Sequence, residues 1–215
     1  MNKTPNNARF ISIEGIEGCG KSTHLSYVVA LLQEEGKAVI ATREPGGTGI
    51  GELVRALLLD PQQTMEPETE LLLMLAARSE HLARVIRPAL AEGQWVVCSR
   101  FVDATYAYQG AGRGIPDTRI ATLVDWVQEG LAPDLTLILD IPVEEGLARV
   151  GKRGPADRFE RERMAFFQRV RSAYLARAKT RPEQYRVIDA LGSPDMVQAR
   201  IAAAMQGFIR QEMAS

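Results

Sequence analysis

A glycine-rich segment near the N-terminus carries the most informative residue spacing in the chain. Residues 15–23 read Gly-Ile-Glu-Gly-Cys-Gly-Lys-Ser-Thr, so that four residues separate Gly15 from Gly20, and Lys21 and Ser22 follow directly. Glycine lets the backbone approach a ligand closely, and backbone N–H groups at the start of a helix bind anions. The spacing is that of a phosphate-binding P-loop, in which Lys21 would reach the β- and γ-phosphates and the Ser22 hydroxyl would bind Mg²⁺. The alternative is a chance glycine turn.

The P-loop interpretation requires a strand before the glycines and a helix after them. Residues 9–14 form an apolar run, and residues 21–35 have a helical pattern that stops before Gly36. Both requirements are met, which disfavours the chance turn. The predicted ligand is a nucleoside triphosphate, bound by the whole loop: Gly15, Ile16, Glu17, Gly18, Cys19, Gly20, Lys21, Ser22 and Thr23.

Two other polar segments interrupt the apolar and helical patterns. Residues 151–163 are rich in arginine and glycine, which is typical of a lid that closes over phosphates, with a solvated charged turn as the alternative. Residues 99–114 follow an apolar run and contain Arg, Asp, Thr, Tyr and Gln, which could hydrogen-bond a second polar ligand. The alternative there is an ordinary polar loop. The sequence contains no Asn-Lys-x-Asp tetrad, which argues against a switch GTPase.

Apolar runs and helical patterns alternate along the chain and must position these segments. The predicted strands are 9–14, 38–43, 95–99, 135–140 and 185–190. The predicted helices are 21–35, 50–59, 68–92, 117–129, 143–150, 159–179 and 194–212. This alternation predicts the α/β class, with a doubly wound, five-stranded parallel sheet, flanking helices and a short lid at about 151–158. Ligands in such sheets bind beyond the carboxyl ends of the strands.

The composition is that of one α/β domain spanning residues 1–215. Hydrophobic residues make up 46% of the 215 residues, and Lys+Arg (26) nearly balance Asp+Glu (27), which argues against a nucleic-acid partner. The polar N-terminus lacks an apolar signal core, and the apolar runs are too short to span a membrane. The two cysteines, Cys19 and Cys98, indicate neither a disulfide framework nor a metal site. We therefore expect a cytoplasmic protein.

Four segments together resemble the thymidylate kinases, and the bacterial members most closely. They are FISIEGIEGCGKST (10–23), TREPGGTGIGELVR (42–55), AAR (76–78) and YAYQGAGRG (106–114). The resemblance extends from Phe10 to about Ala190. It implies a nucleoside monophosphate kinase fold, transfer of the γ-phosphoryl group of ATP to dTMP with Mg²⁺ for dTTP synthesis, and a homodimer. The alternatives are a kinase for another nucleoside monophosphate and a P-loop regulator without turnover.

The resemblance also assigns roles to individual residues. The expected dTMP site comprises Arg43, Glu44, Arg55, Met74, Arg78, Arg100, Thr105, Tyr108 and Gln109. Among these, Arg100 would bind the dTMP phosphate, Arg78 would donate to a thymine carbonyl, and Tyr108 would favour deoxyribose. Arg149 would pack on adenine, in a pocket bordered by Asp189 and Ala190. The P-loop contains no arginine, so Arg153 and Arg158 of the lid are expected to supply the missing charge. The expected catalytic residues are Lys21, Arg100, Arg153 and Arg158.

The chain departs from the family pattern at two positions. Ser99 stands where an aspartate is usual, and Met74 replaces an aromatic residue that stacks on thymine. A methionine sulfur is polarizable and can still cover a ring face. With Ser99 uncharged, we expect Asp103, or as second choice Glu14, to act in the outer shell of Mg²⁺. Three other polar residues, His24, His81 and Asp140, are interpreted as structural or exposed.

Overall fold

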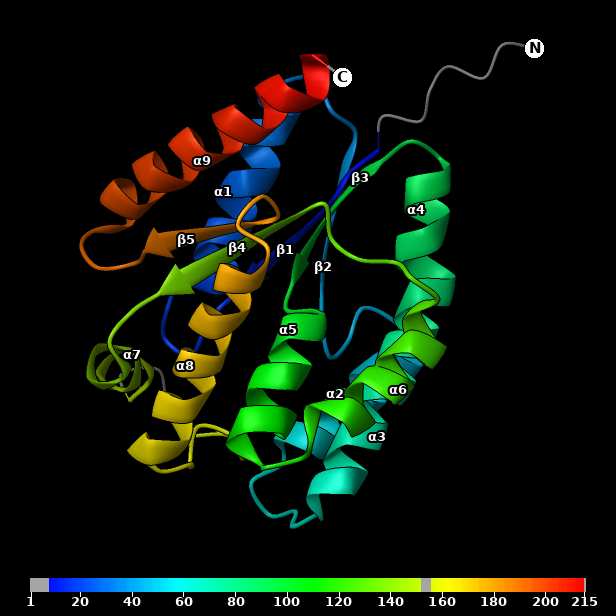
Figure 1. The fold of residues 1–215 in the computed structure, drawn as a ribbon, viewed down its shortest axis with the longest axis vertical. Coiled ribbons are helices and arrows are strands. Elements are labelled where there is room, and N and C mark those ends of the chain that lie inside the picture. Colours follow the sequence, from blue (N-terminus) through cyan, green and yellow to red (C-terminus); the bar gives the residue numbers. More distant parts are fainter. Residues whose placement is uncertain (1–7, 152–155, 215) are drawn as a thin grey trace.

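The computed structural model describes residues 8–151 and 156–214. Its five strands are β1 (Phe10–Glu14), β2 (Val39–Arg43), β3 (Trp95–Ser99), β4 (Leu135–Asp140) and β5 (Tyr185–Asp189). They form one parallel sheet in the order β2-β3-β1-β4-β5 (Figure 1). Because β1 lies in the middle and the chain winds outward to both sides, the predicted doubly wound α/β class is confirmed.

Helices occupy most of the remaining described chain. The α-helices are α1 (Lys21–Glu34), α2 (Gly49–Leu59), α3 (Pro67–His81), α4 (Arg87–Ala91), α5 (Val102–Thr105), α6 (Asp117–Gln128), α7 (Val143–Val150), α8 (Met164–Thr180) and α9 (Pro194–Ala214). Two π-helical segments are η1 (Leu82–Ile86) and η2 (Tyr106–Gly112). Within the described ranges, each helix is too short or too polar to cross a membrane.

Three predicted elements differ from the structure. The helix predicted over 68–92 consists of α3, η1 and α4, and Pro88, which has no backbone N–H, is the second residue of α4. Residues 102–112, for which an ordinary polar loop was the alternative, are helical as α5 and η2. The helix predicted from residue 159 begins at Met164. Asp157 Oδ1 accepts from the N–H groups of Phe159 and Glu160, at 2.9 Å each, and this local turn delays the helix.

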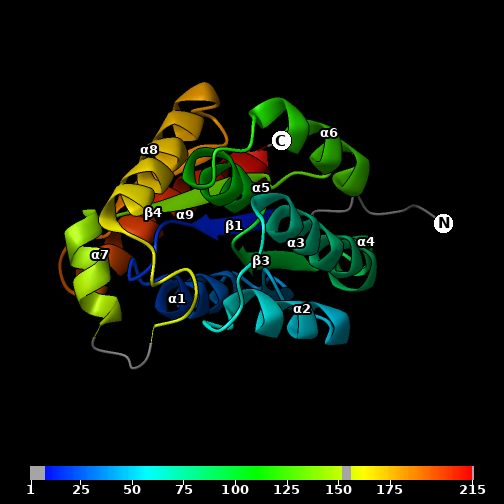
Figure 2. The same cartoon turned by 90° about the horizontal axis from the view of Figure 1, so that it is seen from below.

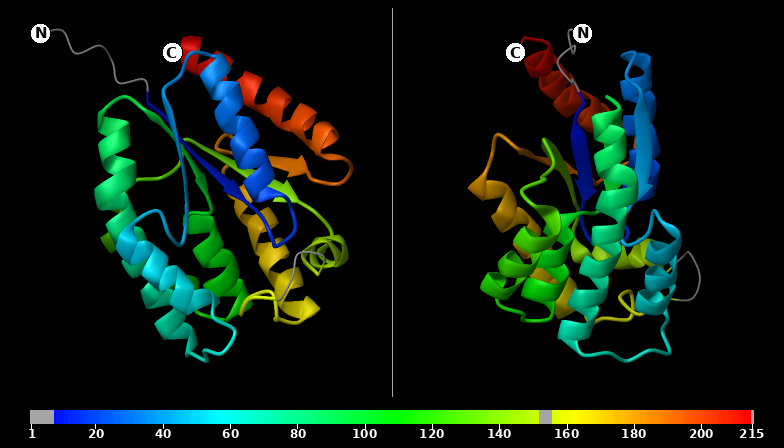
Figure 3. Two further views of the ribbon diagram at one scale, coloured as in Figure 1. Left: turned by 180° about the vertical axis from the view of Figure 1, so that it is seen from behind. Right: turned by 90° about the vertical axis from the view of Figure 1, so that its right-hand side faces the viewer.

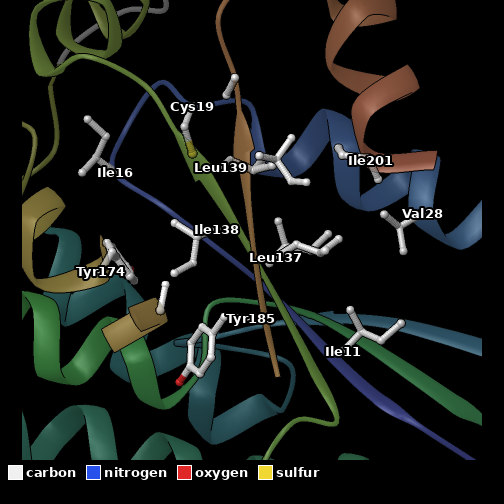
Figure 4. Packing of buried hydrophobic residues seen from close by; sticks show 14 of the residues in the cluster. Ile11, Ile16, Cys19, Val28, Leu137, Ile138, Leu139, Tyr174, Tyr185 and Ile201 are labelled. Carbon is white, nitrogen blue, oxygen red and sulfur yellow. The ribbon is translucent and has the colours of Figure 1, made fainter. Parts of the chain in front are cut away.

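The sheet is covered on both faces. Helices α1 and α9 pack on one face, and α4 and α8 pack on the other (Figures 2 and 3). In Figure 4, Leu137 of β4 lies toward Val28 and Ile201, which come from α1 and α9, whereas Ile138 lies toward Tyr174 of α8. The central strands β1, β3 and β4 are therefore almost fully buried, whereas the edge strands β2 and β5 each contain exposed residues.

Parallel pairing brings the polar segments to one edge of the sheet. Ser99 at the end of β3 is in register with Ile13 of β1 and with Arg43 at the end of β2. The glycine loop after β1, the segment after β2 and the segment after β3 consequently leave the sheet at the same level. This edge is where the predicted site residues can meet.

Candidate active site

The glycine loop wraps around the start of α1. Gly20 precedes the helix with φ of 92°, a left-handed conformation that glycine adopts at little cost. Gly18 packs against α7, where a Cβ atom would lie only 2.1 Å from the carbonyl oxygen of Gly146. A side chain at position 18 would therefore push the loop away from α7, and the glycine keeps the P-loop backbone in place.

Lys21 is the first residue of α1, and its side chain folds back under the loop. The ammonium group donates to the carbonyl oxygens of Gly15 and Ile16, at 3.0 and 2.8 Å. Desolvation, followed by the positive charge of Arg100, lowers the pKa of Lys21. The pKa of Arg55 is likewise lowered by desolvation and then by the neighbouring Arg43. These cations crowd one another, so an anionic ligand would relieve their repulsion.

A cavity of about 450 Å³ opens at this edge, a size typical of small-molecule sites. The P-loop residues in its wall are Glu17, Gly18, Gly20, Lys21, Ser22 and Thr23. The expected dTMP residues in its wall are Arg43, Glu44, Arg55, Met74, Arg78, Arg100, Thr105, Tyr108 and Gln109. The structure thus brings every one of the expected dTMP residues into one cavity with the P-loop, whereas Gly15, Ile16 and Cys19 lie outside its described lining.

Arg100 follows β3 directly and connects the P-loop to the segment after that strand. Its backbone φ of 70° is uncommon for a residue with a side chain, and such conformations cluster at functional sites. The guanidinium donates to Glu17 Oε1 at 2.6 Å and lies 4.7 Å from the centre of the Tyr108 ring. The Tyr108 hydroxyl donates to the other oxygen of Glu17, also at 2.6 Å. Glu17 therefore orients both residues across the cavity.

Arg78 lines the same cavity and has one guanidinium nitrogen without a hydrogen-bond partner in the described part of the chain. Its Nε donates to Glu44 Oε2 at 2.7 Å, and its Nη2 donates to the carbonyl oxygen of Phe101 at 2.9 Å. The guanidinium also lies 4.8 Å from the centre of the Phe101 ring. Its Nη1 is buried and has no hydrogen-bond partner in the described part of the chain. A buried donor without a partner is costly, so this nitrogen is available to an acceptor on a ligand.

The remaining cationic and amide groups are anchored to nearby elements. Arg43 binds both oxygens of Glu52 on α2, at 3.0 and 2.9 Å, and Arg55 donates to the carbonyl oxygen of Pro45 at 3.0 Å. Gln109 Nε2 donates to the buried Glu70 at 2.8 Å. This contact uses only the amide nitrogen of Gln109, so the amide oxygen is still able to accept a hydrogen bond.

Asp103 and Glu14, the two carboxylates expected in the outer shell of Mg²⁺, have protein partners in the structure. Asp103 is 1% exposed, forms an ion pair with Arg177 and accepts a hydrogen bond from Tyr185 at 2.8 Å. Glu14 is 0% exposed and accepts from the Phe101 N–H at 2.6 Å and the Tyr174 hydroxyl at 2.9 Å. Neither belongs to the described lining of the cavity. The expected outer-shell role of both therefore remains a prediction, and in the described structure each carboxylate is buried with protein partners.

The expected lid and adenine residues are only partly placed. Arg153 lies outside the described residues. Arg158 pairs with Glu70 at 2.7 Å, donates to the Leu58 carbonyl oxygen at 2.8 Å and is absent from the described lining of the cavity, so its catalytic role stays a prediction. Arg149 lies beside the P-loop, with its Nη1 3.5 Å from the carbonyl oxygens of Gly18 and Ala190. Arg149 therefore lies next to Ala190, one of the two residues expected to border the adenine pocket.

Sequence reasoning missed several residues of the cavity wall. They are Pro45, Leu59, Phe101, Ala104, Asp157, Phe159 and Glu160. Among these, Phe101 stacks on Arg78. Its position directly after Arg100, at the end of a strand, could have indicated that it belongs to the site. Asp140, interpreted as structural, pairs with Arg171 through both oxygens, at 2.6 and 2.9 Å.

Comparisons with known proteins identify relatives of this chain. A family model described as thymidylate kinase matches residues 13–201. A thymidylate kinase of Pseudomonas putida (strain GB-1) is 56% identical over 203 residues, which cover 94% of this chain and 97% of the relative. A thymidylate kinase of Chromohalobacter salexigens is 59% identical over 198 residues, which cover 91% of this chain and 93% of the relative.

A solved structure shows the same similarity in three dimensions. The crystal structure of thymidylate kinase from Ehrlichia chaffeensis superposes with a TM-score of 0.76 at 33% identity, covering 92% of this chain and 98% of that one. The P-loop, the second set of polar residues in the same cavity and the matches along the sequence lead to one conclusion: this chain belongs to the thymidylate kinase family.

Proposed function

We propose that the cavity between the P-loop and Arg78 is where this protein phosphorylates its substrate. The protein transfers a phosphoryl group from ATP to dTMP and so makes dTDP for dTTP synthesis. The observation that carries the proposal for the site is that one cavity has the P-loop in one wall and a buried, unpartnered Arg78 Nη1 in another. The P-loop wall suits the phosphates of ATP, and the wall that contains Arg78 suits the base of dTMP.

ATP is proposed to bind along the P-loop. The N–H groups at the start of α1 would surround its phosphates, and Arg149, beside Ala190, would pack on the adenine. Lys21 would exchange the carbonyl oxygens of Gly15 and Ile16 for β- and γ-phosphate oxygens. Desolvation, followed by the positive charge of Arg100, lowers its pKa, and the negative phosphates would offset both effects.

The acceptor dTMP is proposed to lie across the other side of the cavity. Arg100, Arg43 and Arg55 would bind its phosphate, and Arg78 Nη1 would donate to a thymine carbonyl oxygen. Tyr108, fixed by Glu17, would contact the sugar. Thr105, Gln109 and Met74 complete the wall around the base.

The chemistry needs positioning and charge neutralisation more than covalent participation by the protein. An oxygen of the dTMP phosphate attacks the γ-phosphorus of ATP, the bond from that phosphorus to the β–γ bridging oxygen breaks, and ADP leaves. The side chains of Lys21 and Arg100 would hold donor and acceptor in line and neutralise negative charge on the transferred group. Arg153 is proposed to add positive charge from the lid.

Mg²⁺ fits the oxygen-rich P-loop end of this cavity. The hydroxyl-bearing Ser22 and Ser99 both line it, and Mg²⁺ in nucleotide sites keeps several waters beside protein and phosphate oxygens. Ser22 would bind the ion directly, and Ser99 would hold a water on it. When bound, the ion neutralises charge on the β- and γ-phosphates.

The homodimer is proposed to form through α3 and α6. Trp126 on α6 is 78% exposed and Leu72 on α3 is 55% exposed, and both line a hollow between these helices. Large apolar side chains gathered at an exposed hollow mark an association surface. The proposed location is the cytoplasm, where reducing conditions suit the free thiols of Cys19 and Cys98.

A nucleotide panel tests the proposed use of the cavity. ADP release is measured with dTMP, dUMP, dCMP and AMP, and without an acceptor, in the wild type and in Arg78→Ala. We expect dTMP to give the highest kcat/KM and dUMP, which lacks one methyl group, to be used about ten- to hundredfold less well. If Arg78→Ala retains the wild-type KM for dTMP, the proposed orientation of dTMP is wrong.

A further inference from the structure

His81, at the end of α3, lies behind the wall of the dTMP side of the cavity. Its side chain is 0% exposed. The ring Nδ1 lies 3.0 Å from Glu44 Oε1, and the ring Nε2 lies 2.6 Å from Thr42 Oγ1. Both ring nitrogens are therefore paired, although His81 itself is absent from the described lining of the cavity.

We propose that His81 is a positioning residue for recognition of the base: it sets the direction of Arg78 through Glu44. The chain of contacts is continuous. His81 binds Oε1 of Glu44, and the other oxygen of the same carboxylate accepts from Arg78 Nε at 2.7 Å. The inference rests on the proposed role of Arg78 toward thymine and adds a determinant of specificity behind it.

The direction of the His81–Glu44 bond follows from chemistry. A carboxylate can only accept, so Nδ1 carries the proton that is donated to Glu44 Oε1, and Nε2 makes the second contact with the Thr42 hydroxyl, which can donate or accept. Two hydrogen bonds at opposite sides of the ring prevent it from turning. Glu44 Oε1 is consequently fixed, which leaves Oε2 in a single position opposite Arg78.

Packing around the ring restricts it further. Gly47 follows the Glu44 segment with φ of 78°, and a Cβ atom there would lie 2.8 Å from His81 Cδ2 and 2.8 Å from Thr42 Oγ1. Only glycine leaves room for the ring in this place. The segment after β2 thus encloses His81 as well as presenting Glu44.

Arg78 has little freedom once Glu44 is fixed. Glu44 takes its Nε, the Phe101 carbonyl oxygen takes its Nη2, and the Phe101 ring covers one face of the guanidinium. The buried Nη1 is then aimed in one direction. A fixed donor suits the carbonyl oxygens of thymine and opposes the amino group of cytosine, because two donors cannot pair.

A matched pair of amide substitutions separates this role from simple space filling. The amide nitrogen of an asparagine falls near the position of Nδ1, and that of a glutamine falls near Nε2. His81→Asn therefore keeps a donor to Glu44 and loses the Thr42 contact, whereas His81→Gln does the reverse. Both side chains are polar and smaller than or similar to the ring, so they differ mainly in which partner they reach.

The measurements are KM for dTMP, KM for ATP and the ratio of kcat/KM for dTMP over dCMP. We expect His81→Gln to raise KM for dTMP roughly three- to tenfold, which is the value of one lost hydrogen bond, and to lower the dTMP/dCMP ratio by a similar factor. KM for ATP should stay near the wild-type value. His81→Asn should restore most of the loss.

Three outcomes overturn the inference: an unchanged dTMP/dCMP ratio in His81→Gln, equal losses in the two variants, or equal losses toward dTMP and ATP. The Arg78→Ala variant distinguishes its failure from that of the proposed function. If Arg78→Ala raises KM for dTMP and His81→Gln does not, only the inference about His81 is wrong. If neither variant raises KM for dTMP, the proposed orientation of dTMP is wrong as well. Where His81→Gln does not fold, His81→Leu, which also removes the donor to Glu44, must give the dTMP-specific rise in KM relative to His81→Asn, and no rise overturns the inference.

Discussion

Arg158 and Glu70 form a buried ion pair in which the guanidinium Nη2 lies 2.7 Å from a carboxylate oxygen. Glu70 is only 1% exposed, and it also binds Arg113 and accepts from Gln109, which lines the cavity. The pair connects the end of the lid segment to α3 and, through Gln109, to the wall of the cavity. In the described conformation, Arg158 thus acts as an anchor for this segment.

Removing this anchor should cost stability. We expect Arg158→Ala to lower the free energy of unfolding by about 1–3 kcal/mol, because Glu70 would lose one of its charged partners while remaining buried. Urea unfolding measures the change. Arg161→Ala is the matched control, since Arg161 is exposed in the same segment and should change stability by less than about 0.5 kcal/mol. A large loss of kcat at unchanged stability would instead place Arg158 in phosphoryl transfer.

Lys21 should be needed for turnover but not for dTMP binding. We expect Lys21→Ala to lower kcat by about a hundredfold or more, because the ammonium group is the P-loop cation that would reach the transferred phosphoryl group. Calorimetric titration with dTMP should give a dissociation constant close to that of the wild type. A folded Lys21→Ala protein with wild-type kcat would contradict the role of the P-loop in catalysis.

Glu14 should make stability fall as the pH rises. Burial, followed by the nearby charge of Asp103, raises the pKa of Glu14 from 4.5 to about 7. Below about pH 4.5 the group is protonated in both the folded and the unfolded state, so it costs nothing. Between about pH 4.5 and pH 7 the unfolded state ionises first, and above this window the folded state is less stable by about 3 kcal/mol.

The variant Glu14→Gln removes this titration. We expect the difference in unfolding free energy, variant minus wild type, to increase between about pH 5 and about pH 8. Urea unfolding of both proteins across this range measures it. A difference that stays constant with pH would show that the Glu14 carboxyl has the same pKa in both states.

A charge at the exposed tryptophan should prevent the proposed dimer. We expect Trp126→Asp to convert the protein to a monomer in sedimentation velocity, because an aspartate in an apolar interface would be buried without a partner. Met196→Asp on α9, at a side chain 53% exposed outside the described lining of the α3–α6 hollow, serves as the control and should leave the mass unchanged. A monomeric wild type at micromolar concentration would rule out the α3–α6 dimer.

The sequence by itself determined the features that depend on short segments. The P-loop is one strand, one turn and one helix in succession, so its spacing could be recognised from residues 10–23 alone. The strands were also predictable, since buried parallel strands are short, nearly continuous apolar runs. Because parallel strands end at a common edge, the sequence even indicated that Arg43, Arg100 and the P-loop would meet.

The tertiary structure decided which partner each charged group takes. Glu14 and Tyr174, which hydrogen-bond, are 160 residues apart, and Asp103 and Arg177 are 74 apart. From the sequence alone, Asp103 and, as second choice, Glu14 were expected in the outer shell of a metal at a strand end. Helix α8 packs over that side of the sheet and brings Tyr174 to Glu14 and Arg177 to Asp103.

The same reason explains why His81 could not be understood from the sequence. A histidine in an apolar helical pattern has no distinguishing spacing, and its partners Thr42 and Glu44 lie 39 and 37 residues away. Local spacing determines which backbone forms an element, because hydrogen bonding and periodicity act within a few residues. The direction in which a buried side chain points depends on neighbours that only packing brings together, and in this protein that packing determines how Arg78 faces the site.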